Sequence, residues 1–330
     1  MYESSQKIIS LLQTPSWQPI KHFFNFLSIQ QGEVLQRQGA PAKGLYVLTT
    51  GKVALSMQTA EKGSSVIAVL DGQGHFGEVA LIDGANCLVT ATALEPVNVI
   101  FMDAKYFQVL KIGFPDVAFE LMSVMLHRAV TKLKSTLDGI TDAITHSSPA
   151  IRSQFSLPVN ECLSLSEGWP LQPITPKQLM SLPSLNVLTN QECERILNAS
   201  KPLFAKAGQC VNQSGHRALL LLIEGDVQLL HESNKVGLIF PPIKPGFMFS
   251  AERMINQSPL TSSLQIVDDA VFLAINELSL WNLRTTDIEL YAKVFDMVMQ
   301  SLAHKMRLVY EHLVMLAETY SLQLHHKSGI

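Results

Sequence analysis

The chain has 330 residues, which is the length of about two domains. Its apolar fraction of 47% is enough for packed cores and is too high for a disordered chain. The formal net charge of -3 argues against an extended basic surface for nucleic acid, although a small basic face is compatible with it.

The termini and the cysteines bear on where the protein works. The N-terminal stretch MYESSQKIISLLQTPSW has no long apolar core and is not a signal peptide, and the longest apolar run, residues 218–223, is too short to cross a bilayer. The four cysteines, Cys87, Cys162, Cys193 and Cys210, are scattered, without the C-x-x-C spacing of a zinc site or the pattern of a disulfide framework. We therefore expect a cytoplasmic protein with no membrane contact.

The first hundred residues predict helices followed by short strands. Residues 1–30 carry a helical apolar stripe that ends with Phe23, Phe24 and Leu27. From Gly32 to Phe101, short β-branched or alternating runs are separated by glycine-containing turns about every 8 to 12 residues. This rhythm is typical of a barrel or sandwich of short antiparallel strands.

Two helices are predicted next. Asp103 is placed to cap a short helix that runs through Leu110, and Pro115 and Asp116 begin a longer one. The longer helix has apolar residues mostly at alternating spacings of three and four, which is the seam of a helix that pairs with a partner. We expect a homodimer through the long helices, and packing of the seam on the protein's own barrel is the alternative. The seam comprises Phe119, Leu126, Val130, Leu133, Leu137, Ile140 and Ile144.

The second half of the chain repeats this order of predicted helices and strands. Residues 145–178 are rich in Ser and Pro and read as a linker. An amphipathic helix over 182–197 follows, with Thr189 and Glu192 spaced as a capping box. A second β-rich region spans 206–275, and a final long helix spans 287–322.

An internal repeat explains this organisation. GEVLQRQGAPAKGLYVLTTGKVAL (32–55) and GQCVNQSGHRALLLLIEGDVQLL (208–230) share the spacing of their glycines and strands, at an offset of about 176 residues. We predict a first domain over 1–144, a linker over 145–178 and a second domain over 179–330.

One segment of the first repeat resembles a known family. Residues 75–93 read HFGEVALIDGANCLVTATA. The run FGEVALIDG, followed by small and β-branched residues, resembles the phosphate-binding cassette of cyclic nucleotide-binding domains, the sensor modules of catabolite-activator-type transcription factors and protein kinase A regulatory subunits. The resemblance is strong over 20–135 and weak over 178–320. It implies an α+β protein with two β-roll domains, each flanked by helices and followed by a long helix.

The resemblance also implies a ligand site. In the family a short helix begins within the cassette, and its free N–H groups face the cyclic phosphate. By position, Gly77, Glu78 and Ala80 match the residues of the family that contact the ribose or contact the ligand through their backbone. Thr90 lies in the following strand. The implied ligand-binding residues are Phe76, Gly77, Glu78, Val79, Ala80, Cys87, Leu88 and Thr90.

Cys87 is the main departure from the family, because it stands where the family has the arginine that binds the phosphate. No basic residue lies between Asp83 and Ala93. Loss of such a partner costs roughly 2–5 kcal/mol of binding free energy. Three interpretations stay open: weak cyclic-nucleotide binding, binding of a less anionic ligand, or no ligand. A redox or metal site formed by Cys87 with His75 belongs to the second interpretation.

The second repeat has a more altered cassette, GFMFSAERMINQSPLTSSLQI (246–266). Ser250 and Ala251 replace the family's Gly and Glu, and Leu260 falls near the arginine position. Glu252 and Arg253 are either a shifted remnant of the site or, more simply, an exposed polar pair. We expect no cyclic nucleotide here.

Several functions are absent from the sequence. Neither long helix is followed by the two short helices and basic recognition helix of a DNA-binding module, so direct DNA binding is not expected. No P-loop, nucleophile elbow, metalloprotease or kinase motif is present, so we expect neither an enzyme nor a metal site. We expect a non-enzymatic, bacterial-type ligand-sensing regulator with a cAMP-like ligand, no other cofactor and a protein partner. The alternative is a ligand-free scaffold protein.

Overall fold

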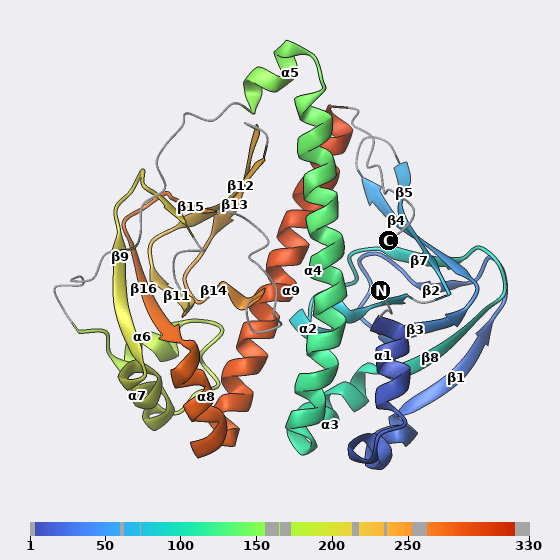
Figure 1. Cartoon of the computed structure of the whole chain (residues 1–330), viewed down its shortest axis with the longest axis horizontal. Helices are drawn as coiled ribbons and strands as arrows, with labels where there is room; N and C mark the ends of the chain where they lie inside the picture. The colour runs from blue at the N-terminus through green and yellow to red at the C-terminus, as the bar shows by residue number, and fades with distance from the viewer. Residues whose placement is uncertain are drawn as a thin grey trace. The chain divides into compact units, whose positions relative to one another are not determined.

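The computed structural model describes residues 4–59, 63–72, 74–155, 165, 173–212, 218–233, 236–252 and 263–320 (Figure 1). Its contacts divide the chain into two compact units. The first unit takes Met1–Thr136 and Val314–Ile330, and the second takes Leu137–Leu313. The domain boundaries that we predicted from the sequence, 144 and 179, stay predictions.

The first unit begins with two helical segments and continues as a β-barrel that is followed by helices. Its elements are α1 (Ser4–Leu11), η1 (Pro15–Phe23), β1 (Phe24–Ile29), β2 (Val34–Gln36), β3 (Gly44–Thr50), β4 (Lys52–Thr59), β5 (Gly63–Asp71), β6 (His75–Phe76), α2 (Glu78–Asp83), β7 (Thr90–Ala93), β8 (Val97–Asp103), α3 (Ala104–Gly113) and the beginning of α4 (Pro115–Thr145). The strands form two four-stranded sheets in the orders β1-β8-β3-β6 and β2-β7-β4-β5, and all their pairings are antiparallel.

The second unit has the same architecture. Its elements, after the end of α4, are α5 (Pro149–Gln154), α6 (Pro176–Ser181), α7 (Asn190–Asn198), β9 (Ser200–Ala205), β10 (Cys210–Asn212), β11 (Ala218–Glu224), β12 (Val227–Ser233), β13 (Val236–Ile243), β14 (Met248–Phe249), β15 (Ser263–Ile266), β16 (Ala270–Asn276), α8 (Glu277–Thr286) and most of α9 (Ile288–Thr319). The sheets have the orders β9-β16-β11-β14 and β10-β15-β12-β13.

The two strand orders are identical when β9–β16 are matched one by one to β1–β8. Corresponding glycines confirm the match. Gly51 and Gly225 have φ of +85° and +84°, and in both cases a side chain would meet a backbone carbonyl within 2.6 Å. Only glycine fits such a position without strain. The internal repeat and the fold of two β-roll domains, each followed by a long helix, are therefore confirmed.

Two sequence-based predictions of secondary structure are wrong. Phe24 and Leu27 do not continue a helix, because residues 24–29 form β1, which pairs with β8 along its whole length. Four successive residues of this edge strand are exposed, so it lacks the alternation that marks a strand. Residues 182–189 are turns or irregular, and the predicted helix begins only at Asn190. Its capping box, Thr189 with Glu192, is confirmed.

The long helices carry the apolar faces that the spacing predicted. Asp103 caps α3 by accepting a hydrogen bond from Lys105 N–H at 2.9 Å, and α4 begins at Pro115. Along α4 the seam is buried within the single chain at six of its seven positions, and Phe119 is half-buried. The prediction of an apolar seam along α4 is confirmed, and the homodimer that we inferred from it stays a prediction.

The cysteines depart from the expected pattern. Cys87 and Cys193 are buried free thiols. Cys210, in β10, is disulfide-bonded. The expectation of unpaired cysteines is therefore wrong at Cys210, because sequence spacing does not reveal a bond that the fold closes. Among the described residues, no helix is both long enough and apolar enough to span a membrane.

Candidate functional site

The candidate site lies where the sheet of the first barrel ends in β6. Strand β6 pairs with β3, so that Phe76 lies opposite Tyr46 and His75 opposite Val47. The rings of Tyr46 and Phe76 stack with their centroids 4.8 Å apart. Phe76 is buried and therefore anchors the start of the cassette in the barrel core.

Gly77 turns the chain from β6 into helix α2. Its φ is +93°, in the left-handed region, and a Cβ there would lie 2.4 Å from the carbonyl oxygen of Gly44. The helix starts at Glu78, and its first intrahelical bond is donated by Leu81 N–H to Gly77 O at 3.1 Å. The earlier amides of the helix have no intrahelical acceptor, so the N-terminus of α2 can donate hydrogen bonds to an anion.

The predicted residues of α2 differ in exposure. Glu78 is half-buried, and its Oε2 atom is excluded from solvent. Val79 is half-buried, whereas Ala80 is buried in the barrel. Glu78 thus has the position and the partial burial that a carboxylate needs to accept a hydrogen bond from a ligand hydroxyl.

Cys87 lies in the loop between α2 and β7 and is held by its backbone. Its N–H donates to Ala40 O at 2.7 Å, and its carbonyl accepts from Gly39 N–H at 2.8 Å. The side chain is 3% exposed. Burial, together with electrostatic interactions with Cys87 and Asp103, raises the pKa of the Tyr46 phenol to about 12. Cys87 therefore lies close to the buried Tyr46.

Strand β2 and the turn that follows it contribute two glutamines that the sequence analysis missed. Gln36 is 5% exposed; its Nε2 donates to Val89 O at 3.1 Å, and its Oε1 would lie 3.4 Å from a Cβ on Gly77. Gln38 N–H donates to Thr90 Oγ1 at 3.0 Å. Thr90 is thus engaged with the barrel, and Leu88 beside it is half-buried. No pattern in the sequence indicated these two residues, since the burial of Gln36 follows only from the fold.

His75 contacts the long helix of the first unit. Its Nε2 lies 3.1 Å from the backbone carbonyl oxygen of Met125 in α4, so the ring connects β6 to the long helix of the first unit. Trp17 in η1 also binds this helix, donating from Nε1 to Glu120 Oε2 at 2.9 Å. Among the described residues, no three His, Cys, Asp or Glu side chains form a group that could hold a metal ion.

The corresponding region of the second barrel is built differently. Ser250 follows β14 as Gly77 follows β6, and it keeps the left-handed conformation with φ of +63°. Its hydroxyl is buried and has no hydrogen-bond partner among the described residues. Ala251, the counterpart of Glu78, is 1% exposed. The carboxylate of the first site is therefore replaced by a buried methyl group.

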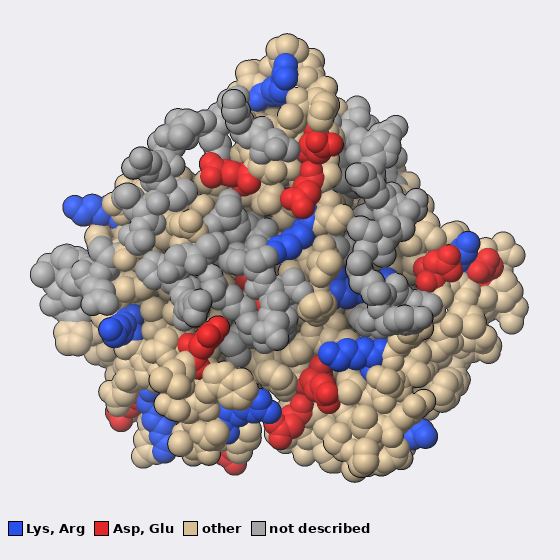
Figure 2. All heavy atoms as spheres, in the orientation of Figure 1, with Lys and Arg blue, Asp and Glu red and all other residues tan. Residues whose placement is uncertain are grey.

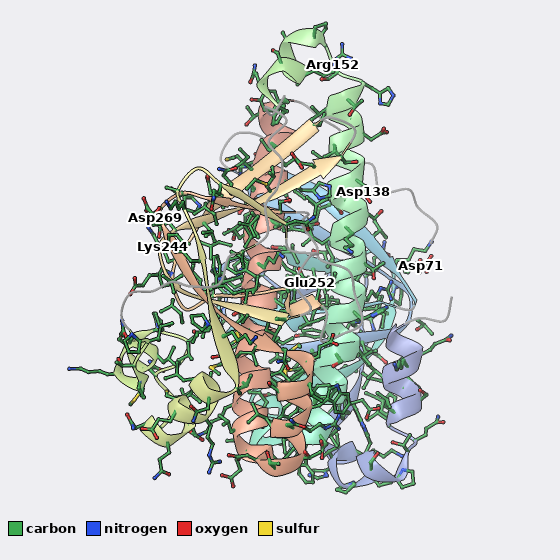
Figure 3. All side chains as sticks on the ribbon, turned by 60° about the vertical axis from the view of Figure 1, so that its left-hand side comes forward. Asp71, Asp138, Arg152, Lys244, Glu252 and Asp269 are labelled. Atoms are coloured by element: carbon green, nitrogen blue, oxygen red, sulfur yellow. The ribbon has the colours of Figure 1, made fainter. Side chains whose placement is uncertain are left out.

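A buried ion pair occupies this region of the second barrel. Lys305 Nζ in α9 lies 2.7 Å from Glu252 Oε1, and the two side chains are 1% and 0% exposed. Figure 3 shows Glu252 lying against α9. Ser301, one turn earlier in the helix, accepts a hydrogen bond from Met248 N–H at 3.2 Å. The expectation that Glu252 is an exposed polar residue is wrong, because Lys305 neutralises it in the interior. Arg253 and Leu260 lie outside the described residues.

Comparisons with known proteins agree with the geometry of the first barrel. Residues 26–111 match the family model described as the cyclic nucleotide-binding domain. The CRP-like cAMP-activated global transcriptional regulator of Mycobacterium tuberculosis is 22% identical over 206 residues, which are 62% of this chain and 84% of that protein. The cAMP-dependent protein kinase regulatory subunit of Dictyostelium discoideum is 30% identical over 84 residues, 24% of this chain and 26% of that protein.

A solved structure of the regulatory domain of Toxoplasma gondii PKA with cAMP is also similar. It covers 93% of this chain and 89% of its own, with 14% identity and a TM-score of 0.28. The sequence match of the first barrel runs from within β1 to near the end of α3, and therefore includes the whole cassette. The resemblance of residues 26–111 to the cyclic nucleotide-binding domain, first indicated by the cassette, is confirmed.

Proposed function

We propose that this chain is a non-enzymatic regulatory protein that senses a small ligand at the first barrel. The observation that carries the proposal is the N-terminus of α2, where Gly77 in the left-handed conformation is followed by the half-buried carboxylate of Glu78. Such a helix start donates to an anion while the carboxylate accepts from a hydroxyl, which suits a cyclic nucleotide. Two relatives are named as cAMP-activated or cAMP-dependent regulators.

We further propose that this binding is weak or altered, because Cys87 offers no charge to a phosphate. Its thiol is buried, and no Lys or Arg lies between Asp83 and Ala93. The absence of a charge-assisted partner costs roughly 2–5 kcal/mol, or about 30-fold to several thousand-fold in affinity. The proposed contacts are the backbone of Gly77, Val79 and Ala80 and the carboxylate of Glu78, while Phe76, Cys87, Leu88 and Thr90 shape the walls.

We propose that ligand binding acts on the long helix α4 through His75. A ligand on the N-terminus of α2 would favour one position of β6, and the contact between His75 and Met125 would pass this preference to α4. Such a switch requires the ligand to bind one position of the helix more tightly than the other, since equal affinities shift no population.

Thermal unfolding of the purified full-length protein with cyclic AMP, cyclic GMP or cyclic di-GMP tests the proposal. A ligand at a hundredfold excess over its Kd stabilises the folded state by about 2.7 kcal/mol. The variant Cys87→Arg is expected to raise nucleotide affinity about 30-fold or more. Cys87→Gln introduces a long polar side chain without the charge of arginine and is the matched control. It is expected to leave nucleotide affinity unchanged.

The variant Glu78→Ala is expected to weaken the same binding. If no nucleotide shifts the unfolding temperature, and both Cys87→Arg and Glu78→Ala are without effect, the ligand site is refuted. The protein is then better described as a scaffold in which both barrels have lost their ligands. The buried ion pair of Lys305 and Glu252 already favours this description for the second barrel, where we propose that no nucleotide binds.

The remaining expectations are part of the proposal. On the face that Figure 2 shows, the Lys and Arg side chains of the described residues stand singly or in small groups among acidic ones, which supports the absence of direct DNA binding. We also propose a protein partner and a homodimer. Most of the apolar seam of α4 is buried in the single chain, so the seam does not identify the dimer surface. A cytoplasmic location also remains proposed, and the disulfide at Cys210 weighs against it.

A further inference from the structure

The two barrels differ in how their edge strands are protected. In the order of the sheets, β1 and β5 are the long edge strands of the first barrel, and β9 and β13 are those of the second. Strand β9 contains Lys201 and Pro202, and β13 contains Pro241 and Pro242. Proline lacks the N–H that a neighbouring strand would need, and a charged side chain also discourages strand addition. Both edges of the second barrel are therefore blocked.

Strand β1 of the first barrel has neither form of protection. Its sequence, FNFLSI, contains no proline and no charged residue. It pairs with β8 over six consecutive residue pairs without a bulge. Phe26 is 78% exposed and Leu27 is 36% exposed, so apolar side chains project to solvent at the centre of the edge. An exposed, regular and uncharged apolar edge is a surface for pairing with another strand.

The other edge of this barrel is less suitable. Strand β5 contains a bulge where it pairs with β4, between the partners of Leu55 and Ser56, and it ends at Asp71. A bulge twists an edge away from the flat geometry that an added strand needs. Exposed Val66 and Val69 on β5 provide a matched comparison, because they are apolar and lie at an edge that is not regular.

The residues that flank β1 indicate which strand would join it. Lys21 precedes the strand and Glu33 follows it, and both side chains are exposed. When two copies of β1 pair antiparallel, the beginning of one strand lies beside the end of the other. Lys21 of each copy then comes near Glu33 of the second copy, at both ends of the paired strands. A parallel arrangement would instead bring like charges together.

We propose that β1 joins two copies of this chain into a symmetric dimer. The strands pair antiparallel about a twofold axis that passes between the Leu27 residues of the two copies, and the two sheets merge into one of eight strands, four from each copy. Leu27 then lies beside Leu27 of the other copy, and Phe26 lies beside Ser28 of the other copy. Twofold symmetry makes this interface self-complementary. This dimer surface goes beyond the proposed ligand sensing and does not depend on it.

The molar mass in solution tests the dimer. Light scattering after size-exclusion chromatography of the full-length protein is expected to give twice the 36.5 kDa of one chain. Phe26→Lys places a charge in the centre of the interface and, by symmetry, does so twice. Its dimer dissociation constant is expected to rise at least about a hundredfold. Val69→Lys at the β5 edge is the control and is expected to leave the mass of the dimer unchanged.

A charge exchange identifies the antiparallel register. Lys21→Glu and Glu33→Lys are each expected to weaken the dimer about threefold to tenfold, and the double variant is expected to restore it. A monomer at all concentrations overturns the proposal. So does a dimer whose mass is insensitive to Phe26→Lys. Neither result affects nucleotide binding, so a failure here is distinguishable from a failure of the proposed ligand site.

Discussion

The two barrels have one topology but two different structures at the turn after their sixth strand. In the first barrel, Gly77 leads into the N-terminus of α2, where Glu78 carries a carboxylate. In the second, Ser250 keeps the left-handed backbone, while Lys305 from the long helix forms a buried ion pair with Glu252. The comparison teaches that the β-roll itself does not create a ligand site. A few residues at this turn decide whether the barrel presents hydrogen-bond donors or closes on its own helix.

The largest expected effect comes from breaking the ion pair of the second barrel. Lys305→Met leaves the carboxylate of Glu252 buried without its ammonium partner, which is expected to lower the free energy of unfolding by about 3–5 kcal/mol. Adding Glu252→Gln removes the charge and is expected to restore most of the loss. Urea denaturation followed by circular dichroism measures both variants.

The exposed ion pair of Lys244 with Asp226 in the same unit is the control for this experiment. Figure 3 shows Lys244 at the periphery of the second barrel. Lys244→Met is expected to cost no more than about 1 kcal/mol, since solvent screens the pair. If Lys305→Met and Lys244→Met lower the free energy of unfolding equally, the buried ion pair does not hold α9 to its barrel.

Reduction of the disulfide at Cys210 in β10 is expected to have the next largest effect. Cys87 and Cys193 are not disulfide-bonded. Thiol titration of the denatured protein should therefore detect fewer thiols before reduction than the four cysteines that it detects afterwards. Reduction is expected to lower the free energy of unfolding by roughly 2–4 kcal/mol. Four reactive thiols without a reductant would contradict the bond.

Exchanging residues at the shared left-handed position compares the two turns directly. Gly77→Ala places a Cβ 2.4 Å from the Gly44 carbonyl oxygen at φ of +93°, and is expected to cost about 1–3 kcal/mol. Ser250→Gly relieves the same conformation and removes a buried hydroxyl that has no hydrogen-bond partner in the described part of the chain, and is expected to stabilise the fold by about 1 kcal/mol. Thermal unfolding measures both, and a destabilised Ser250→Gly variant would refute this interpretation.

The smallest effect is a pH dependence in the second unit. His312 in α9 contacts the ring of Phe240 at 5.2 Å between centroids, and burial lowers the pKa of its imidazole despite a hydrogen bond with the Ile239 backbone. The unfolded chain therefore binds the proton more readily. The free energy of unfolding should fall slightly as the pH drops from about 7 to about 5. His312→Phe is expected to remove this slope, whereas replacement of the exposed His146 by Ala should not.

Features that depend on neighbouring residues were predictable from the sequence. The capping box of Thr189 and Glu192 and the cap at Asp103 need only the residues beside them, and both are present. The start of α2 after Gly77 follows from the cassette, in which the glycine and the helix-forming residues are adjacent. The spacing of glycines also indicated the repeated topology, because each of them marks a turn that only glycine permits.

Features that depend on distant residues were not predictable. Lys305 and Glu252 are far apart in the chain, and no pattern at either position indicates that α9 brings them together. Gln36 reaches the turn at Gly77 only through the pairing of β2 with β7. The strand β1 was mistaken for helix because its partner β8, rather than its own apolar pattern, makes it a strand.

The identical strand orders have a consequence for how the chain folds during synthesis. Strand β8 could in principle be paired by β9, which follows in the same chain, instead of by β1. Such exchange between like domains is a common cause of misassembly in tandem proteins. Pro202 does not prevent this exchange, because β9 pairs with β16 along its whole length with the proline in place. The side chains that each strand buries, rather than the proline, must therefore direct each nascent barrel to its own strands.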